Sequence, residues 1–380
     1  MLIAGEASGD SLAAELVYAL RAELATPQAA AGTLHFFGAG GPKLVAAGVE
    51  LAFDLTQHSV IGLWEVVKNY GKFKRLFDQL LKLACERRPD FIICVDFSGF
   101  NRRFAAAIRA KVRAQRGGDW NPKIIQYVSP QVWASRPGRA KQMARDYDLL
   151  LAIFPFEQAW YAKQAPSLRV EFVGHPMIER FNVQHSTFNI QRPTALLLPG
   201  SRVGELKRHL PVMLEAARLI QMAMPTVSFR MILPNEELKR MVVVPDVLKP
   251  SLQVQIGGLA EALAEADVAI ASTGTVTLEC AYFGVPTVAI YKTSWSTYQI
   301  GKRIIQVIYL AMPNLLANEA VFPELIQDAA TGGNISREAL DLLNNPARRG
   351  VVKTKLAKVI ASLGGAGASA RAAQAVLSLR

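Results

Sequence analysis

A glycine turn followed by a helix lies in the second half of the sequence, and its residue types suit a nucleoside diphosphate. Ser272-Thr273-Gly274-Thr275 connects an apolar run, 268–271, to a helix that we expect to extend through Phe283. Gly274 lets a ligand approach the backbone, and the first amides of a helix lack partners and attract anions. Glu279 follows one helical turn later, where its carboxylate could accept hydrogen bonds from both ribose hydroxyls. The alternative is an ordinary strand–helix–strand crossover with a well-capped helix.

Three further side chains stand near the ends of predicted strands. Asp96 follows the apolar run 90–95, and ligands of doubly wound sheets bind just outside the carboxyl ends of strands. A carboxylate there is a candidate general base, although it could equally cap the next helix. Arg202 follows the predicted strand 194–198 and could offer charge-assisted hydrogen bonds to a phosphate or a uracil carbonyl. His175 lies in a Gly-His-Pro turn, which favours a hydrogen-bonded hinge residue over a base, although we expect it to face any cleft between the domains and so to be a candidate residue of the acceptor site.

The start of the sequence repeats the strand–turn–helix design. Residues 2–4 form a short predicted strand, and the turn after it leads into a helix that reaches about Leu24. A glycine-bearing turn at a helix start can hold an anion or a sugar. The candidate binding residues in this turn are Glu6, Ser8, Gly9 and Asp10. The next glycine-rich stretch, Gly38 to Pro42, follows a predicted strand at 34–37 and reads as a structural turn.

The composition is that of a well-packed globular enzyme with room for two domains. The chain has 380 residues, of which 51% are hydrophobic and 19% are charged. Its three cysteines lack metal-ligand spacing, and the apolar surroundings of Cys94 and Cys280 predict buried thiols in a reducing compartment. The acidic start is unlike a signal peptide, and the longest uncharged run, 304–318, is too short to span a bilayer. We therefore expect a cytoplasmic protein.

The formal net charge of +12 favours anionic partners, whether nucleic acid, lipid headgroups or phosphorylated substrates. Two stretches, 102–116 and 136–145, contain several basic residues and no acidic ones. Phe104 is the only aromatic residue in the first stretch, which argues against a groove that stacks nucleic-acid bases. Solvated helix faces explain each stretch more simply.

One predicted helix has the pattern of a membrane-surface helix. Within residues 59–82, apolar side chains recur at helical spacing and basic side chains border them. We expect the first part of this helix to contact an anionic phospholipid surface through Trp64, Val66, Val67, Lys68, Tyr70, Lys72, Phe73 and Arg75. Beyond Arg75, an amphipathic helix that covers a parallel sheet is the favoured interpretation.

Strands and helices alternate through both halves, which predicts an α/β fold with two parallel-sheet domains. We expect an N-terminal domain over residues 1–175, a polar linker over 176–193 and a C-terminal domain over 194–363. Residues 364–380 are expected to form a helix that packs back on the N-terminal domain. A helix over 295–310 and a turn into a helix at 321–327 are further expectations.

Nine short motifs match one protein family in order and spacing. They are AGEASGD, GLWEV, YVSPQVWA, FPFE, FVGHP, LLPGSR, STGTVTLE, PNLLAN and FPELIQ, and they cover nearly the whole chain. In these motifs the sequence resembles bacterial lipid-A-disaccharide synthase, a family-19 glycosyltransferase of the GT-B class. The resemblance implies two Rossmann-like domains facing across a cleft, the first for the acceptor and the membrane and the second for the UDP-sugar.

The resemblance also implies the reaction and its partners. The enzyme would join UDP-2,3-diacylglucosamine to 2,3-diacylglucosamine 1-phosphate with inversion, giving tetraacyl disaccharide 1-phosphate and UDP for lipid A biosynthesis. It would be peripheral on the inner face of the inner membrane. No cofactor, metal or nucleic acid is expected, and the resemblance leaves the oligomeric state open.

Five functional residues carry over from the family. Its essential aspartate falls on Asp96, its PGSR arginine on Arg202, its ribose-binding glutamate on Glu279, its PNLL asparagine on Asn314 and its ELxQ glutamine on Gln327. The chain departs from the family pattern at Gly99, where a second acidic residue is usual, and in having WASR for WAWR and NLLAN for NLLAG.

Three other interpretations concern the class of enzyme or partner. The sequence Asp146-Tyr147-Asp148 resembles the D-x-D of metal-dependent glycosyltransferases, but it begins a buried strand and chance explains it better. Another UDP-sugar enzyme of the same fold class, such as a UDP-N-acetylglucosamine transferase or 2-epimerase, would share the nucleotide motifs without a surface for acyl chains. A nucleic-acid-binding protein would use the basic stretches.

Overall fold

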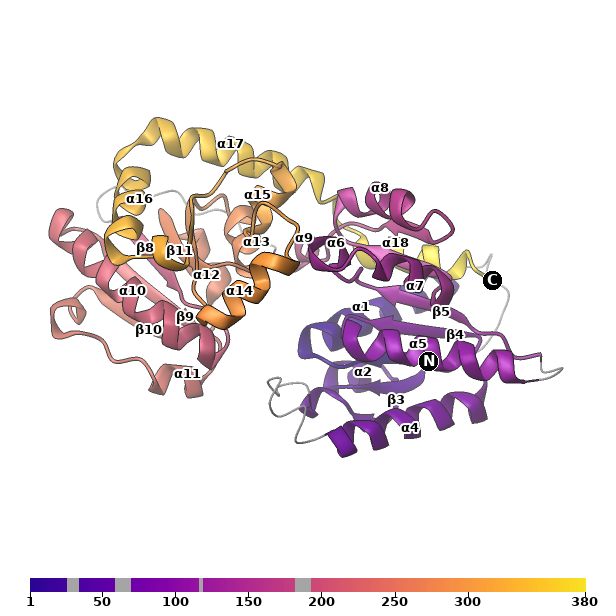
Figure 1. Cartoon of the computed structure of the whole chain (residues 1–380). Coiled ribbons are helices and arrows are strands. Elements are labelled where there is room, and N and C mark those ends of the chain that lie inside the picture. Colours follow the sequence, from indigo (N-terminus) through magenta and orange to yellow (C-terminus); the bar gives the residue numbers. More distant parts are fainter. Residues whose placement is uncertain (26–33, 59–69, 116–118, 182–192) are drawn as a thin grey trace. The chain divides into compact units, whose positions relative to one another are not determined.

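The computed structural model describes residues 1–25, 34–58, 70–115, 119–181 and 193–380, which form two compact units (Figure 1). Unit 1 comprises Met1–Glu179 together with Leu363–Arg380, and unit 2 comprises Arg180–Ser362. The chain therefore leaves unit 1, builds unit 2 and returns. Most of the expected linker, 182–192, lies outside the described residues.

Unit 1 contains a seven-stranded parallel sheet with the order β3-β2-β1-β4-β5-β6-β7. Its strands are β1 (Leu2–Ala4), β2 (Phe37–Gly40), β3 (Glu50–Asp54), β4 (Phe91–Val95), β5 (Lys123–Tyr127), β6 (Leu149–Ala152) and β7 (Arg169–Phe172). Its helices are α1 (Ala7–Leu24), α2 (Pro42–Ala46), η1 (Thr56–His58), α4 (Tyr70–Arg87), α5 (Ser98–Ala114), α6 (Val132–Ser135), α7 (Arg139–Asp146), α8 (Pro155–Gln164) and α18 (Ala368–Leu377), and α9 (Met177–Arg180) ends at the boundary with unit 2.

Unit 2 contains a six-stranded parallel sheet with the order β10-β9-β8-β11-β12-β13. Its strands are β8 (Thr194–Leu198), β9 (Ser228–Leu233), β10 (Leu252–Ile256), β11 (Val268–Ser272), β12 (Thr287–Tyr291) and β13 (Glu324–Ile326). Its helices are α10 (Val203–Ala223), α11 (Glu236–Arg240), η2 (Asp246–Leu248), α12 (Leu259–Ala264), α13 (Thr275–Tyr282), α14 (Trp295–Ile304), α15 (Met312–Ala317), η3 (Gln327–Ala329), α16 (Gly332–Asn344) and α17 (Pro346–Ser362).

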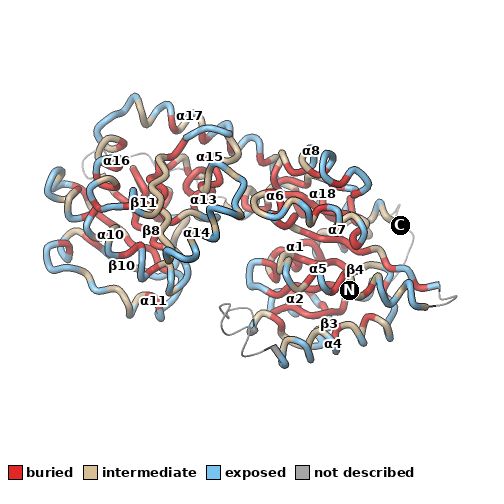
Figure 2. The backbone as a smooth tube through the Cα atoms, in the orientation of Figure 1, coloured by how far each residue is buried: buried red, intermediate tan, exposed pale blue. Residues whose placement is uncertain are grey.

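The central strands are apolar because helices cover both faces of each sheet. All five residues of β11 are buried, and so are the last four of β4, and Figure 2 shows the strands of both units mainly in the colour of buried residues. The predicted α/β class with two Rossmann-like parallel-sheet domains is therefore confirmed. Cys94 and Cys280 are buried free thiols, as expected, and burial raises the pKa of each to about 12.

Three expectations about local structure are wrong. The glycines from Gly38 to Gly40 belong to β2 itself, because a Cβ at Gly38 would lie 1.8 Å from the Leu2 carbonyl oxygen of the neighbouring strand. The helix expected over 295–310 ends at Ile304. Residues 324–326 form the edge strand β13 rather than a turn into a helix, because pairing with β12 overrides their local preference.

Residues after Ser362 pack on the first unit through small side chains. Ala368, Ala372, Ala373 and Ala375 of α18 are buried, and α18 contacts α1. Arg371 donates through Nε to the Val173 carbonyl at 2.8 Å, and Gln374 donates to Glu23 at 3.0 Å. Small side chains allow the close approach, and these hydrogen bonds fix its register.

Candidate active site

The strand order of unit 1 reverses between β1 and β4, so the loops after these two strands meet at one edge of the sheet. Ala4 pairs with Val95, which brings the two carboxyl ends level. A Cβ added at Gly9 would lie 3.4 Å from the Asp96 Cβ, and one at Gly5 would collide with the Phe97 ring. The glycines of the first motif therefore let its loop pack directly against Asp96.

Asp96 stands on a strained backbone that buried amides hold in place. Asp96 and Phe97 have φ angles of 49° and 42°, in the left-handed region, which costs on the order of 1–3 kcal/mol for each residue. The Asp96 carbonyl accepts hydrogen bonds from Asn101 Nδ2 at 2.9 Å and from Gln126 Nε2 at 3.1 Å. Gln126 in turn accepts from the Tyr147 hydroxyl at 3.0 Å. Asn101 and Gln126 are fully buried, so this network fixes the turn and the direction of the Asp96 side chain.

The carboxyl group of Asp96 is in an environment that suits a base. Burial raises its pKa, and a hydrogen bond from the Phe97 amide works in the opposite direction. A carboxylate whose pKa is raised toward the working pH accepts a proton more effectively in a transition state. The sequence-based prediction of a carboxylate at the mouth of this sheet therefore has the expected geometry.

The other predicted residues of the first motif differ in what they can do. Glu6 and Ser8 are exposed at the start of α1. Asp10 is buried, and its two carboxylate oxygens accept the amides of Gly41, Lys43 and Leu44 at 2.7–3.2 Å, so it caps α2. Contact of Asp10 with a substrate stays a prediction; the three amides use both acceptor positions of Oδ1 and one of the two on Oδ2.

His175 occupies the hydrogen-bonded turn that its Gly-His-Pro context favoured. Its ring Nδ1 accepts the Met177 amide at 3.2 Å, and its own amide donates to the Leu363 carbonyl at 2.9 Å. Its ring lies 5.5 Å from that of Phe154. These contacts give His175 a structural part at the return of the chain to unit 1.

Glu157 is a buried acid that the sequence interpretation did not single out. It accepts hydrogen bonds from Trp133 Nε1 at 2.9 Å and from the Phe154 amide at 3.1 Å, and burial raises its pKa to about 7. It thereby joins the loops that follow β5 and β6. The signal in the sequence was the pair of motifs VSPQVWA and FPFE, whose Trp and Glu bond to each other.

The second reversal of strand order lies in unit 2, between β8 and β11. Leu198 pairs with Ala271, so the loops after β8 and β11 begin at the same edge. Ser272 is buried at the end of β11, whereas Gly274 and Thr275 are exposed at the start of α13. Gly274 has a φ of 142°, and a Cβ there would meet no atom within 4 Å. The first turn of α13 thus presents backbone amides to solvent, as an anion site requires.

Glu279 lies one turn along α13 and is half-buried. Burial raises its pKa, and the charge of Arg180 opposes that effect. Within the part of the chain that the structure describes, its carboxylate has no hydrogen-bond donor. A desolvated carboxylate with unused acceptor positions is suited to the vicinal hydroxyls of a ribose.

Arg202 is the N-cap residue of α10 and extends into solvent, with 80% of its side chain exposed. Its guanidinium forms an ion pair with Glu205 at 3.1 Å. Glu205 also accepts the Ser201 amide at 2.9 Å. An exposed pair of this kind contributes little to stability, so the guanidinium can turn to a phosphate at small cost.

Asn314 is buried and fully hydrogen-bonded inside the chain. Its Nδ2 donates to the Phe322 carbonyl and to Glu324 at 2.8 Å, and its Oδ1 accepts the amides of Val321 and Phe322. These four bonds use the whole capacity of an amide side chain. Its direct contact with the UDP-sugar stays a prediction, and the geometry gives it the task of folding the loop before β13.

Gln327 and His209 connect the loops around the second reversal of strand order. Gln327 accepts the Thr293 amide at 2.7 Å and donates to the Thr293 carbonyl at 3.2 Å, which clamps the start of the β12–α14 connection. His209 is buried, bonds through Nδ1 to the Pro199 carbonyl at 2.8 Å and accepts the Lys292 amide on Nε2 at 3.0 Å. His209 was not predicted, because nothing in its local sequence shows which carbonyl and amide it joins.

The remaining predicted features lie elsewhere. Trp64, Val66, Val67 and Lys68 fall outside the described residues. Lys72 and Arg75 are exposed and Phe73 is half-buried, whereas Leu80 is fully buried and Phe77 lies 5.3 Å from the Phe100 ring. The later part of α4 therefore packs on the core, as favoured. None of the helices described is both long and apolar enough to cross a bilayer.

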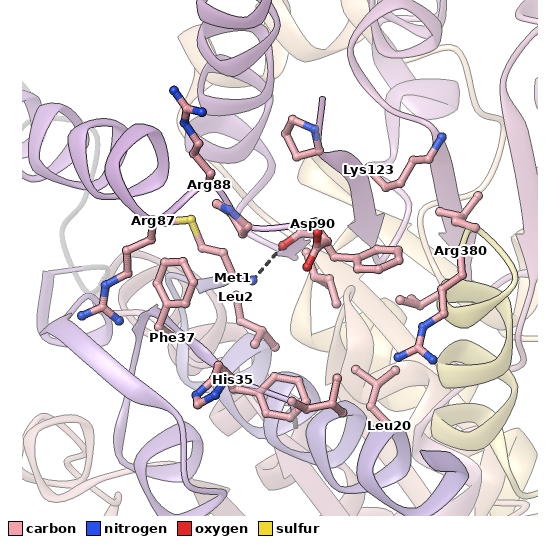
Figure 3. A pocket seen from close by; sticks show the side chains of 18 of the residues that line it. Met1, Leu2, Leu20, His35, Phe37, Arg87, Arg88, Asp90, Lys123 and Arg380 are labelled. Carbon is pink, nitrogen blue, oxygen red and sulfur yellow. Dashed lines mark hydrogen bonds between the residues drawn. The ribbon is translucent and has the colours of Figure 1, made fainter. Parts of the chain in front are cut away.

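Two features lie at the opposite, amino-terminal edge of the first sheet. Asp148 precedes β6, pairs with Arg109 and accepts the Ile124 amide at 2.7 Å, so the D-x-D sequence stands away from Asp96. A cavity of about 630 Å³ also opens there (Figure 3), where the Met1 ammonium donates to the Phe91 carbonyl at 2.7 Å. It is lined by Phe37, Arg87, Asp90, Trp120, Lys123 and Arg380, among others. Ligands of such sheets bind at the other edge.

Comparison with known proteins identifies the family of the chain. A family model described as lipid-A-disaccharide synthetase matches residues 1–378. The lipid-A-disaccharide synthases of Geobacter metallireducens and Geobacter sulfurreducens are 38% and 37% identical, each over 100% of this chain and 96% of the relative. The crystal structure of a Neisseria meningitidis UDP-GlcNAc 2-epimerase bound to UDP-GlcNAc shares the fold, with a TM-score of 0.59, 11% identity and 99% of each chain covered. The chain belongs to the lipid-A-disaccharide synthase family and is a glycosyltransferase of lipid A biosynthesis.

Proposed function

We propose that the enzyme transfers 2,3-diacylglucosamine from UDP to the primary hydroxyl of 2,3-diacylglucosamine 1-phosphate. In this reaction the acceptor oxygen forms a bond to the anomeric carbon while the bond from that carbon to the UDP oxygen breaks. Attack from the face opposite UDP inverts the anomeric configuration. Membership of the family carries the proposal, and the two reversals of strand order support it, because they offer places for the acid–base and the nucleotide chemistry.

Asp96 is the proposed general base. Its carboxylate would take the proton of the acceptor hydroxyl as that oxygen attacks. Three observations support this role: its position after β4, its raised pKa and the buried amides that hold its backbone. Glu6, Ser8 and Gly9 would contribute to the acceptor side of the site.

UDP is the proposed leaving group, and residues of unit 2 would hold it. Arg202 and the amides at the start of α13 would meet the charge that develops on the diphosphate, so the proposed transfer needs no metal ion. Glu279 would accept the two ribose hydroxyls. Gln327 and Asn314 would keep the surrounding loops in place.

The proposed substrates carry acyl chains, so we place the enzyme at the inner face of the inner membrane. The side chains of Trp64, Val66, Val67 and Phe73 would enter an anionic phospholipid surface, with Lys72 and Arg75 near the headgroups. Replacing Val66, Val67 and Phe73 by Ser should lower sedimentation with anionic vesicles and leave UDP affinity unchanged. Retained binding in that variant at high salt would refute this contact.

A direct assay tests the reaction. The purified protein is incubated with both lipids in mixed micelles containing a chelator, and the products are identified by mass spectrometry and by the anomeric coupling in NMR. The expected result is an inverted disaccharide 1-phosphate and an equal amount of UDP. Failure with these lipids together with epimerisation of UDP-N-acetylglucosamine would replace the proposal by the epimerase alternative.

A further inference from the structure

We propose that unit 2 has a lipid-contact surface of its own, formed by α14 and the residues that follow it. This surface, the α14 patch, consists of Trp295, Ile300, Ile305 and Ile308 with Lys302 and Arg303. The proposed occupant is the headgroup and upper acyl region of an anionic phospholipid layer. The inference rests on the proposed lipid substrates and adds a contact to the one proposed for residues 59–82.

The exposure of the α14 patch is the first observation. Trp295 is 75% exposed, Ile300 59%, Ile305 42% and Ile308 82%, and no residue of α14 is buried. Figure 2 accordingly draws α14 in the colours of exposed and intermediate residues. Single exposed apolar residues are ordinary, whereas several large ones along one short stretch indicate an interaction site.

The charge of the surrounding chain is the second observation. Between Glu279 and Glu319 the sequence has no acidic residue, and it has three basic ones, Lys292, Lys302 and Arg303. Lys302 and Arg303 are exposed, and the Lys302 ammonium lies 5.7 Å from the Tyr298 ring centroid. Large apolar side chains beside cationic ones complement a layer that is apolar inside and anionic at its surface. Trp and Tyr also prefer the level of the headgroups.

The connection of the α14 patch to the nucleotide site is the third observation. α14 follows β12, and the carboxyl end of β12 adjoins that of β11, where Ser272 leads to the first turn of α13. Gln327 fixes Thr293 between β12 and α14. A lipid contact at α14 would therefore hold the UDP-binding edge of this sheet at the surface from which a diacylated donor must come.

Vesicle binding by the full chain tests the proposal. The vesicles contain equal parts of phosphatidylglycerol and phosphatidylcholine, and the variant is Ile300→Ser/Ile305→Ser/Ile308→Ser. The matched control is Val243→Ser/Val247→Ser, which removes apolar side chains that are 80% and 58% exposed in the same unit, next to Asp246. We expect the partition of the isoleucine variant to fall by about tenfold and that of the control to stay at the wild-type value. Equal partition of the two variants would overturn the proposal.

The contribution of the basic side chains and the insertion of Trp295 into the lipid layer are tested separately. Lys302→Gln/Arg303→Gln should weaken binding at low salt and reduce its salt dependence, with no change on phosphatidylcholine alone. Phosphatidylglycerol with brominated acyl chains should quench the fluorescence of Trp295. This quenching is measured as the difference in fluorescence loss between the wild type and Trp295→Phe. Absence of that difference would also overturn the proposal.

Two outcomes would assign the α14 patch to another occupant. A variant that keeps its vesicle binding but changes its oligomeric state would make the patch a protein contact. A variant that keeps its vesicle binding but loses turnover only with long-chain donors would make it an acyl-chain site. UDP affinity should match wild type in all variants, and wild-type disaccharide formation reports on the proposed reaction independently of vesicle binding.

Discussion

The two reversals of strand order have the same topology but different chemistry. In unit 1 the loops after β1 and β4 are packed tightly, and the functional group is a side chain on a strained, hydrogen-bonded backbone. In unit 2 the loops after β8 and β11 and the start of α13 present backbone amides, an exposed arginine and a carboxylate that accepts no hydrogen bond from the residues that the structure describes. The first arrangement fixes the direction of one acid, whereas the second leaves several groups free to surround a flexible anion. One topology thus suits the proposed base in one unit and the proposed binding site in the other.

The largest expected effect comes from removing the acid of unit 1. Asp96→Asn keeps size and hydrogen bonding but cannot accept a proton, so kcat should fall by about 10²–10⁴-fold. The affinity for UDP should stay unchanged by calorimetry. Because burial raises the pKa of Asp96, wild-type kcat/KM should fall with decreasing pH at a higher pH than for an ordinary aspartate, and the variant should lack this limb.

Helix capping gives the opposite expectation for the same variant. Asn caps a helix about as well as Asp, so a capping role predicts nearly normal turnover. Nearly normal turnover in a variant with an unchanged melting temperature would show that Asp96 is not the base. The proposed chemical difference between the unit 1 and unit 2 sites would then be wrong. Glu6 would then be the next acid to test in this loop.

The next largest effect should come from Arg202 in unit 2. Arg202→Ala would remove the hydrogen bonds that we propose between its guanidinium and UDP; charge-assisted bonds are worth about 1.5–3 kcal/mol, so UDP affinity should fall by about 10–100-fold together with turnover. Arg208→Ala is the matched control, because Arg208 is an exposed arginine of the same helix that bonds to the Gly204 carbonyl at 2.7 Å. Equal affinities of the two variants in calorimetry would show that Arg202 does not contact the nucleotide.

Glu279→Gln should give a smaller effect that depends on the sugar of the nucleotide. An amide oxygen is a weaker acceptor than a carboxylate, so the affinity for UDP should fall by about fivefold. The affinity for 2′-deoxy-UDP should fall by less, because that nucleotide lacks one of the two hydroxyls. Ribose hydroxyls favour the charged carboxylate, so UDP binding to the wild type should weaken as the pH falls through the raised pKa of Glu279. A similar loss for both nucleotides would place Glu279 away from the ribose.

The smallest effect concerns the histidine that connects the loops of unit 2. Burial lowers the pKa of His209, so the folded protein favours the neutral ring. Its contribution to stability is complete above the unfolded pKa of about 6.5 and is lost as the pH falls from there toward the folded pKa. His209→Gln should therefore reduce the drop in melting temperature between about pH 7.5 and about pH 5.5. The substitution should also lower the free energy of unfolding by about 1 kcal/mol, because it removes a hydrogen bond. An unchanged drop would show that His209 does not titrate in this range.

Local chemistry in the sequence was sufficient to predict the elements that carry the second candidate site. The sequence predicted an apolar run at 268–271 followed by a helix that extends through Phe283, and β11 and α13 follow that pattern to within about two residues. Apolar runs and glycine stops depend on nearby residues, which the sequence displays directly. The position of Asp96 at a strand end was predictable for the same reason.

The supports of both sites depend on distant contacts and were not predictable. Gln126 reaches the Asp96 carbonyl across 30 residues, and His209 reaches the Lys292 amide across 83. Asn314 illustrates a different limit of the sequence. A family motif marks this residue as functional, but the motif cannot show that its side-chain amide already forms all the hydrogen bonds it can. Hydrogen-bond partners far apart in sequence emerge only when the sheets have formed.

The return of the chain to unit 1 sets an order on folding during synthesis. Unit 2 is one continuous insertion, so all of its strands and helices are synthesised before α18. Unit 1 cannot complete its fold until then. Before α18 is available, α1 lacks the buried alanine side chains that pack on it, and the Val173 carbonyl lacks its hydrogen bond from Arg371. The nascent first unit therefore exposes apolar surface for as long as the second takes to be translated, and chaperones and proteases will compete for it during that interval.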